Sequence, residues 1–376
     1  MALFLFLIKI RRKPAVYVID YSCAKCPDDT KTSLETMFYF LKGLGNIRDR
    51  DILFQSKVFL KSGIGEEAHV PRANLTKGMG CSASLISLGL ARDLLQVHRN
   101  TARYALIASS EVIQALYVGK ERPMMVTNCL FRSAGNAVVL SNRREDKKRA
   151  KMEVMHVVRV NTARHDDAHH VVEMREDEEG ICGASLSPQL VKIASDALTA
   201  NIERLAPRVL PLTELCKAGW NMVQKNVLKK KAVQPFVPNF KLAFEHFCIH
   251  PGGRAVIEGV GKGLKLSPYD IEPSAMALHR FGNTSCSGVW YTLAYMEAKE
   301  RLKRGDRVWQ IGLGSGFKCT SAVLRVLKDL HCEHNNPWSD CVHRYPVCED
   351  LQMQPHIASL IASMHKYLDV PPPKVS

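Results

Sequence analysis

The sequence predicts an α/β protein with two substructures. Alternating apolar and polar residues at 15–23 and a buried apolar run at 104–113 are typical of strands, whereas 28–63 has helical character. Strand-like and helix-like segments mix in both halves of the chain, which favours a layered arrangement of sheet and helix. A length of 376 residues exceeds what one small hydrophobic core usually holds, so two halves or a pseudo-repeat are expected.

The remaining elements of the N-terminal half have local signals. Apolar runs predict strands at 136–142 and 151–160. A helix is expected to begin at Ser187, which is a good N-cap. Pro188 suits its first position, and Pro207 follows its expected end.

The C-terminal half follows a segment rich in lysine and proline at 208–235, which is predicted to link the halves. A helix is expected to end near 245–256, and another lies around 289–303. Strands are predicted at 306–314 and 318–327.

Composition and charge exclude some classes of protein. Apolar residues make up 46% of the chain, which is ordinary for a globular protein and too high for a disordered one. The net charge of +15 favours a polyanionic partner, such as nucleic acid, an anionic membrane surface or a phosphorylated cofactor. The basic clusters at 10–13, 142–151 and 225–231 have no interleaved aromatic residues, so nucleic-acid binding is disfavoured.

The N-terminus reads MALFLFLIKIRRKP, in which eight apolar residues precede a basic cluster. Eight residues are too few to cross a bilayer, and no small-residue cleavage site follows them. The sequence therefore predicts no complete transmembrane helix and a protein that is soluble or peripherally attached.

The twelve cysteines are scattered through apparent core segments, so we expect reduced thiols. Cys23 and Cys26 form a CxxC pair, but no second ligand pair has suitable spacing. The C-terminal cysteines and histidine match no standard zinc module: Cys332, Cys341, His343 and Cys348. No metal site and no cofactor are expected.

The stretch KGMGCSASLISLG places Cys81 before an apolar helix. A thiolate at a helix N-terminus is stabilised by the helix dipole and the free amide hydrogens. Gly78 and Gly80 permit tight turns and close approach of a ligand. A catalytic nucleophile and a buried core thiol are both consistent with this stretch alone.

Two further clusters contain histidine, asparagine and glycine. His246 and His250 lie four residues apart in EHFCIHPGGR, where no carboxylate occupies the position that a zinc protease uses. His279 and Asn283 lie in HRFGN. The glycine loop at 312–316 follows a strand but precedes another strand, so it is a poor nucleotide-binding loop.

These motifs in combination resemble the plant 3-ketoacyl-CoA synthases. The resemblance rests on GMGCSASLISLGLARDLLQVH, NCLFRSAGNAVVLSN, FKLAFEHFCIHPGGRAVIE, HRFGNTSCSGVWYTLAYMEAK and GDRVWQIGLGSGFKCTSAV, and it runs from about Val16 to Val347. The family condenses acyl groups in very-long-chain fatty acid elongation and is related to chalcone synthase.

The resemblance implies a thiolase-like fold with two pseudo-repeated α/β halves layered as αβαβα. The N-terminal half would span 15–207, after a remnant of the membrane region at 1–14, and carry the nucleophile. The C-terminal half would span 236–376 and carry the catalytic histidine and asparagine, with 208–235 as the linker.

The resemblance also implies the site and its chemistry. Cys81 matches the acyl-carrying nucleophile, His250 the catalytic histidine and Asn283 the asparagine of RFGN, while His246 and His279 match further family histidines. Acyl-CoA and malonyl-CoA would be the substrates. Homodimerisation, partnership with other elongase enzymes and attachment to the endoplasmic reticulum membrane are implied as well.

The chain departs from the family in three places. Family members begin with two membrane-spanning helices, whereas only MALFLFLI precedes the basic cluster here. A long helix–strand–helix segment of the family has no counterpart before RANLTKGMGCSA, so we expect the N-terminal half to be incomplete. Removing a core strand and its helices should expose apolar surface on neighbouring elements. Asn161 stands where the family usually has a histidine, which His165 would replace if the loop shifted. The alternative to an active synthase is a truncated, non-catalytic partner of intact synthases.

Overall fold

The computed structural model describes residues 14–24, 34–43, 48–64, 80–98, 100, 103–111, 117–226, 228, 236–347 and 363–364. The expectations for the N-terminal apolar segment, Gly78, Cys26 and Cys348 lie outside the described residues.

Seven strands form one mixed sheet in the order β2-β3-β1-β4-β9-β8-β7. They are β1 (Tyr17–Cys23), β2 (Tyr104–Glu111), β3 (Ala134–Ser141), β4 (Met152–Asn161), β7 (His246–Ile249), β8 (Arg307–Gly314) and β9 (Lys318–Val326). β7 and β8 pair in parallel, and the other neighbours pair antiparallel. A separate hairpin joins β5 (Val172–Glu176) to β6 (Cys182–Leu186).

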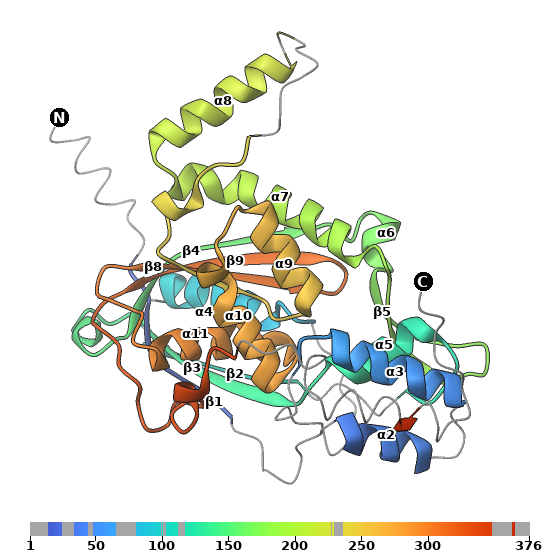
Figure 1. Ribbon diagram of the computed structural model, residues 1–376. Helices are drawn as coiled ribbons and strands as arrows, with labels where there is room; N and C mark the ends of the chain where they lie inside the picture. Colours follow the sequence, from blue (N-terminus) through green and yellow to red (C-terminus); the bar gives the residue numbers. More distant parts are fainter. Residues whose placement is uncertain are drawn as a thin grey trace, which may run out of the picture.

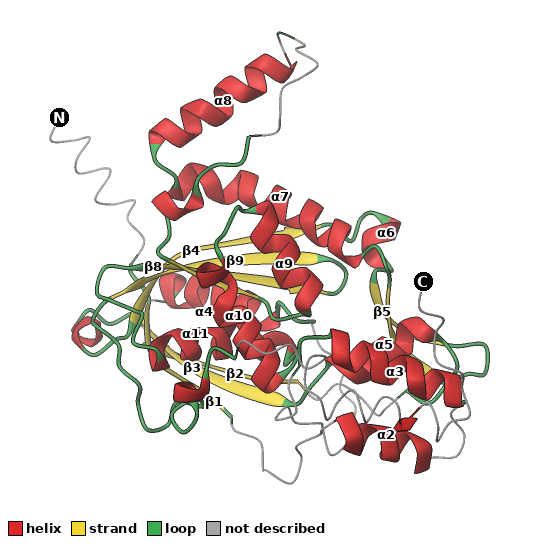
Figure 2. Ribbon diagram, in the orientation of Figure 1, coloured by secondary structure: helices red, strands yellow, loops and turns green. Residues whose placement is uncertain are grey.

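The helices lie in layers around this sheet. They are α2 (Leu34–Gly43), α3 (Asp49–Lys61), α4 (Ala83–Val97), α5 (Arg122–Leu130), α6 (Asp166–His169), α7 (Leu190–Val209), α8 (Leu212–Asn226), α9 (Arg254–Gly263), α10 (Pro268–Phe281) and α11 (Gly288–Ala298). Figure 1 shows α4, α10 and α11 between the β1–β3 part of the sheet and the β4, β8 and β9 part, with α7 and α9 outside the latter. Figure 2 shows the same alternation of helix and strand layers.

Two apolar clusters form the core of these layers. Between the two parts of the sheet, Leu85 and Leu88 of α4 pack with Trp290 of α11, all fully buried. On the outer side, Ala197 of α7 packs against Trp309 of β8. The first cluster holds α4 in the middle of the fold, because the buried leucines of this helix face the inner core.

Pairing of β4 with β9 joins the two halves of the chain. Met152 pairs with Val326, and Asn161 pairs with Lys318 at the other end of the ladder. Beside this ladder, Lys151 forms ion pairs with Glu297 at 2.9 Å, Asp20 at 2.9 Å and Glu333 at 3.2 Å. The halves therefore share one sheet and one ionic cluster, in which the Lys151–Glu297 pair is buried.

The N-terminal part of the sheet is open on one side. No helix in the described part of the chain covers the outer face of β1, β2 and β3 (Figure 1), and β2 is an edge strand. Leu106 on β2 is 68% exposed, and Leu90, Leu94 and Val97 on α4 are also exposed. The sequence analysis expected exposed apolar surface on the elements beside the missing segment, and β2 and α4 expose such surface.

Two local predictions were wrong, and a third segment has more secondary structure than expected. The segment at 246–249 is a strand, not the end of a helix, since it pairs in parallel with β8. α7 begins at Leu190, three residues after Ser187, and Pro207 lies inside its last turn. The predicted linker contains the 15-residue helix α8.

Candidate active site

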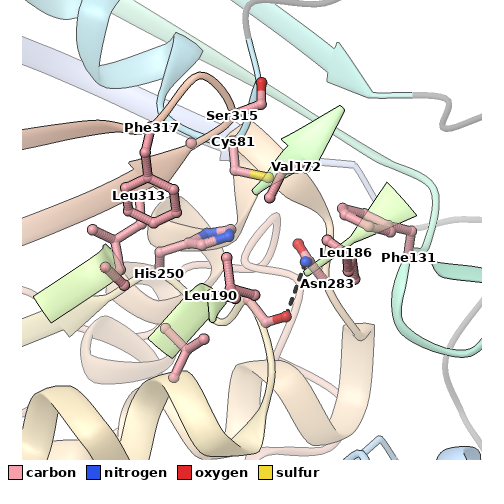
Figure 3. Close-up of a pocket in the computed structure, with 14 residues that line it drawn as sticks. Cys81, Phe131, Val172, Leu186, Leu190, His250, Asn283, Leu313, Ser315 and Phe317 are labelled. Atoms are coloured by element: carbon pink, nitrogen blue, oxygen red, sulfur yellow. Dashed lines mark hydrogen bonds between the residues drawn. The ribbon is translucent and has the colours of Figure 1, made fainter. Parts of the chain in front are cut away.

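One pocket brings together residues from both halves of the chain (Figure 3). Its empty volume is about 460 Å³, and Cys81, His250 and Asn283 lie on its wall. Cys81 precedes α4, His250 follows β7 and Asn283 follows α10. The other lining residues are mostly apolar: Phe131, Val172, Leu186, Leu190, Ala194, Gly252, Val256, Leu313, Gly314, Ser315 and Phe317.

The glycines around Cys81 allow two loops to meet. Gly80 has a φ of +77°, and a Cβ there would lie 2.4 Å from the Ser315 Oγ. A Cβ on Gly314 would lie 2.8 Å from the backbone nitrogen of Ser82. A side chain at either position would push the loop after β8 away from the start of α4, so both positions require glycine.

The surroundings of Cys81 differ from those of the buried thiols. Cys81 is partly exposed, and it lies at the N-terminus of a 15-residue helix that favours the thiolate. Burial raises the pKa of Cys129 to about 12 and also raises the pKa of Cys319. Those two thiols stay protonated, which leaves Cys81 as the better nucleophile.

His250 is held in the pocket as a neutral imidazole. Its backbone N–H donates to the Ile311 carbonyl at 2.8 Å, which fixes the residue at the end of β7. The side chain is 3% exposed, and burial lowers the pKa of His250 to about 4. A neutral imidazole offers one N–H donor and one acceptor at physiological pH.

The lowered pKa of His250 predicts a dependence of stability on pH. An unfolded histidine binds a proton near pH 6.5. Between pH 6.5 and 4 the unfolded chain holds a proton that the folded chain lacks, so stability falls as the pH falls through this window. The loss relative to His250→Gln should reach roughly 3 kcal/mol. Urea unfolding of both proteins at several pH values measures it, and parallel stability curves would contradict it.

Asn283 is fixed by hydrogen bonds on both atoms of its amide. The Nδ2 donates to the Gly252 carbonyl at 3.1 Å, and the Oδ1 accepts from the Ser285 backbone N–H at 2.9 Å. The Asn283 backbone also pairs with the chain near Phe131 as an isolated bridge. The asparagine side chain therefore has one orientation, next to the turn that carries His250.

Ser285 contacts Cys81 and was not predicted from the sequence. Its hydroxyl donates to the Cys81 Sγ at 3.3 Å, and its φ is +52°, in the left-handed region that non-glycine residues seldom adopt. The Ser84 hydroxyl of α4 donates to the Cys286 carbonyl and ties this turn to the helix that follows Cys81. In the sequence, the position of this serine two residues after the asparagine of RFGN is the signal that could have identified it.

Replacing Ser285 by alanine should make Cys81 less reactive at neutral pH. A hydroxyl that donates to a thiolate stabilises the charged form, so its loss should raise the pH midpoint of Cys81 alkylation by about one unit. Iodoacetamide labelling of Cys81 across pH measures this midpoint.

Ser287→Ala is the matched control for this prediction, since Ser287 is buried in the same turn and its hydroxyl has no partner among the described residues. Equal midpoints for the two variants would show that the Ser285 bond does not act on the thiol.

The other predicted histidines lie outside the pocket. His246 is at the opposite end of β7 from His250, and its Nε2 lies 2.8 Å from the Asp306 carboxylate. The His279 ring packs edge-on against Tyr345, with centroids 5.8 Å apart. Asn161 and His165 are exposed and do not line the pocket.

The described part of the chain contains no group of three or more histidine, cysteine, aspartate or glutamate side chains placed to hold a metal ion. None of the helices in this part of the chain has both the length and the apolar character that a membrane span needs.

Comparison with known proteins assigns the family. The profile described as FAE1/Type III polyketide synthase-like protein matches residues 7–77 and 73–227. "3-Ketoacyl-CoA synthase 8" of Arabidopsis thaliana is 39% identical over 431 residues, covering 92% of this chain and 88% of that relative. The chain belongs to the 3-ketoacyl-CoA synthase family. "3-Ketoacyl-CoA synthase 16" of Arabidopsis thaliana is 52% identical over 278 residues, covering 74% of this chain and 56% of that relative.

The second half of the chain and the solved structures agree with this family. The profile described as 3-oxoacyl-acyl-carrier-protein synthase III C terminal matches residues 243–326. The polyketide synthase PKS-I of the brown alga Ectocarpus siliculosus superposes with a TM-score of 0.62 at 12% identity, covering 84% of this chain and 100% of that one. The fold is therefore thiolase-like, as the sequence predicted.

The comparisons also show that this chain is internally shorter than synthase 8. The match to synthase 8 extends over 431 residues but covers 92% of a 376-residue chain, so several tens of positions in that relative have no counterpart here. The family profile matches in two pieces that meet at residues 73–77. The chain also spans 56% of the length of synthase 16. The break between the two pieces lies just upstream of Cys81.

Proposed function

We propose that the chain condenses malonyl-CoA with a long-chain acyl-CoA to give 3-ketoacyl-CoA. The observation that carries this proposal is the convergence of Cys81, His250 and Asn283 on one largely apolar pocket, in a chain of the 3-ketoacyl-CoA synthase family. The named relatives are synthases of that product.

In the first half-reaction, the Cys81 thiolate attacks the carbonyl carbon of the acyl-CoA thioester. The carbon–sulfur bond to CoA breaks, CoA leaves and the acyl group stays on Cys81. The Ser285 hydroxyl and the N-terminus of α4 favour the thiolate before the attack.

In the second half-reaction, malonyl-CoA enters the same pocket. The bond to its carboxyl group breaks, carbon dioxide leaves and the electron pair forms an enolate of the thioester. A neutral His250 and the second N–H of the Asn283 amide are suited to donate to the enolate oxygen. The enolate carbon then attacks the acyl carbonyl, and the bond to Cys81 breaks as the product forms.

The apolar side of the pocket suits the acyl chain. Five apolar residues line this part of the pocket: Val172 and Leu186 of the β5–β6 hairpin, Leu190 and Ala194 of α7, and Phe317 of the loop after β8. Burying an alkyl chain against these side chains contributes roughly 0.8 kcal/mol for each methylene group. The site therefore favours long acyl groups.

Family resemblance supports two further proposals. The chain would work at the endoplasmic reticulum membrane with the other enzymes of an elongase complex. It would also form a homodimer. Both proposals come from the family rather than from contacts in this structure.

Product formation tests the proposed function directly. Incubation with a long-chain acyl-CoA and malonyl-CoA should give a 3-ketoacyl-CoA two carbons longer, together with carbon dioxide, and mass spectrometry detects both. A folded, monodisperse protein that forms neither product would favour the alternative of a non-catalytic partner.

A further inference from the structure

Helix α8 projects from the body of the protein (Figure 1), and one of its faces is anchored there. Glu214 is 3% exposed, and its carboxylate accepts from the Asn239 backbone N–H at 2.9 Å and from the Lys217 Nζ at 2.7 Å. Leu215 packs against the core beneath α7. These contacts fix which side of α8 faces the protein.

Several large apolar side chains of α8 are exposed to solvent. Leu212 is 74% exposed, Trp220 60% and Met222 63%, and Val223 is exposed as well. At 1.5 Å per residue, these side chains are distributed along about 17 Å of the helix. Soluble proteins seldom expose so many large apolar side chains on one projecting helix, so α8 is suited to contact a binding partner.

The charge around α8 indicates the chemistry of that partner. Glu214 is the only acidic residue from 212 to 235, and its carboxylate is turned to the body. The same stretch contains five lysines, three of them consecutive at 229–231. Apolar side chains that include tryptophan, followed in the sequence by a run of lysines, suit the interface of a bilayer with anionic headgroups.

We propose that α8 lies in the interface of an anionic lipid bilayer, with Leu212, Trp220 and Val223 inserted between the headgroups. The inference rests on the proposed membrane location and names the surface that makes the contact. It also gives the proposed reaction a physical advantage, because long-chain acyl-CoA partitions into the same interface. It uses no residue of the catalytic pocket.

Trp220 makes this proposal measurable. The other three tryptophans, Trp290, Trp309 and Trp338, are fully buried, whereas Trp220 is exposed. Adding phosphatidylcholine vesicles that contain phosphatidylserine should shift the tryptophan emission to shorter wavelength, and brominated lipid should quench it. Trp220→Phe should lose the vesicle-dependent part of the signal. Pure phosphatidylcholine vesicles and high salt should weaken the response.

Binding to the vesicles should depend on the apolar face of α8. Leu212→Ser with Val223→Ser should weaken vesicle binding by about tenfold or more, as measured by co-sedimentation. Leu106→Ser is the matched control, because Leu106 is an exposed leucine on β2, away from α8.

Two outcomes would overturn the proposal. The first is a tryptophan emission spectrum that does not change when anionic vesicles are added. The second is self-association of the protein in lipid-free buffer that the α8 variants abolish, because this face would then be a contact between two copies of the chain. Acyl transfer to Cys81 in lipid-free buffer is measured in parallel. Failure of vesicle binding with acyl transfer intact refutes the inference alone, and the reverse result refutes only the proposed function.

Discussion

Cys81→Ala should carry no acyl label after incubation with a radiolabelled long-chain acyl-CoA, whereas the unaltered protein becomes labelled in the absence of malonyl-CoA. No other sulfur in the pocket wall can replace it, because Cys81 is the only cysteine that lines this pocket among the described residues. Condensation should fall at least ~1,000-fold, the scale seen when an essential nucleophile is removed.

Cys216→Ala is the matched control for the nucleophile, since Cys216 is an exposed thiol on α8 and does not line the pocket. It should keep the label. Equal labelling of the Cys81→Ala protein would mean that the acyl group sits elsewhere, and the proposed role of Cys81 would be refuted.

Lys151→Met should lower the free energy of unfolding by about 3–5 kcal/mol, because it leaves the buried Glu297 carboxylate without its cation. The Tyr21 hydroxyl still donates to Glu297 at 2.6 Å, but a hydroxyl does not neutralise a buried charge. Chemical denaturation measures the loss.

Two comparisons separate this effect from a general loss of packing. The double variant Lys151→Met with Glu297→Leu should recover much of the loss, since no buried charge is then left unpaired. Lys120→Met breaks an ion pair with Glu179 in which both side chains are about half exposed. It should lower the free energy of unfolding by no more than about 1 kcal/mol. A double variant as unstable as the sum of its parts would contradict the proposed coupling.

The internal shortening bears on how α4 is supported. Leu85 and Leu88 bury one face of the helix in the inner core, while Leu90 and Val97 on another face are exposed. The N-terminus of α4 is nevertheless held by the loop after β8 and by the turn at 283–287, both from the C-terminal half. The position of Cys81 therefore depends on contacts from the C-terminal half of the chain.

Much of the fold followed from local pattern. β8 and β9 were predicted within one residue of their observed bounds, because each is an apolar segment bounded by charged residues or glycine. The start of α11 was also predicted within one residue, but the helix ends at Ala298, five residues before its predicted end. The apolar stripe after Cys81 likewise predicted α4. Such elements can be read from the sequence, since their own residues determine which face is buried.

The errors arose where distant pairing decides the local structure. The four residues of β7 are too few to distinguish a buried strand from a helix end, and parallel pairing with β8 resolves them. That pairing also separates His246 from His250 by the full length of the strand. The lysines and prolines around α8 suggested a linker, whereas its leucine and tryptophan spacing allows an amphipathic helix.

The sequence by itself determined the family, the α/β layering and the three residues matched to its catalytic motifs. Only the tertiary structure decided that Ser285 contacts Cys81, that His246 and His279 lie outside the pocket, and that α8 presents an apolar face. The reason is physical: a residue's own neighbours in sequence determine its helix or strand preference. Which side chains meet in a pocket depends on the pairing of strands far apart in the chain, such as β4 with β9.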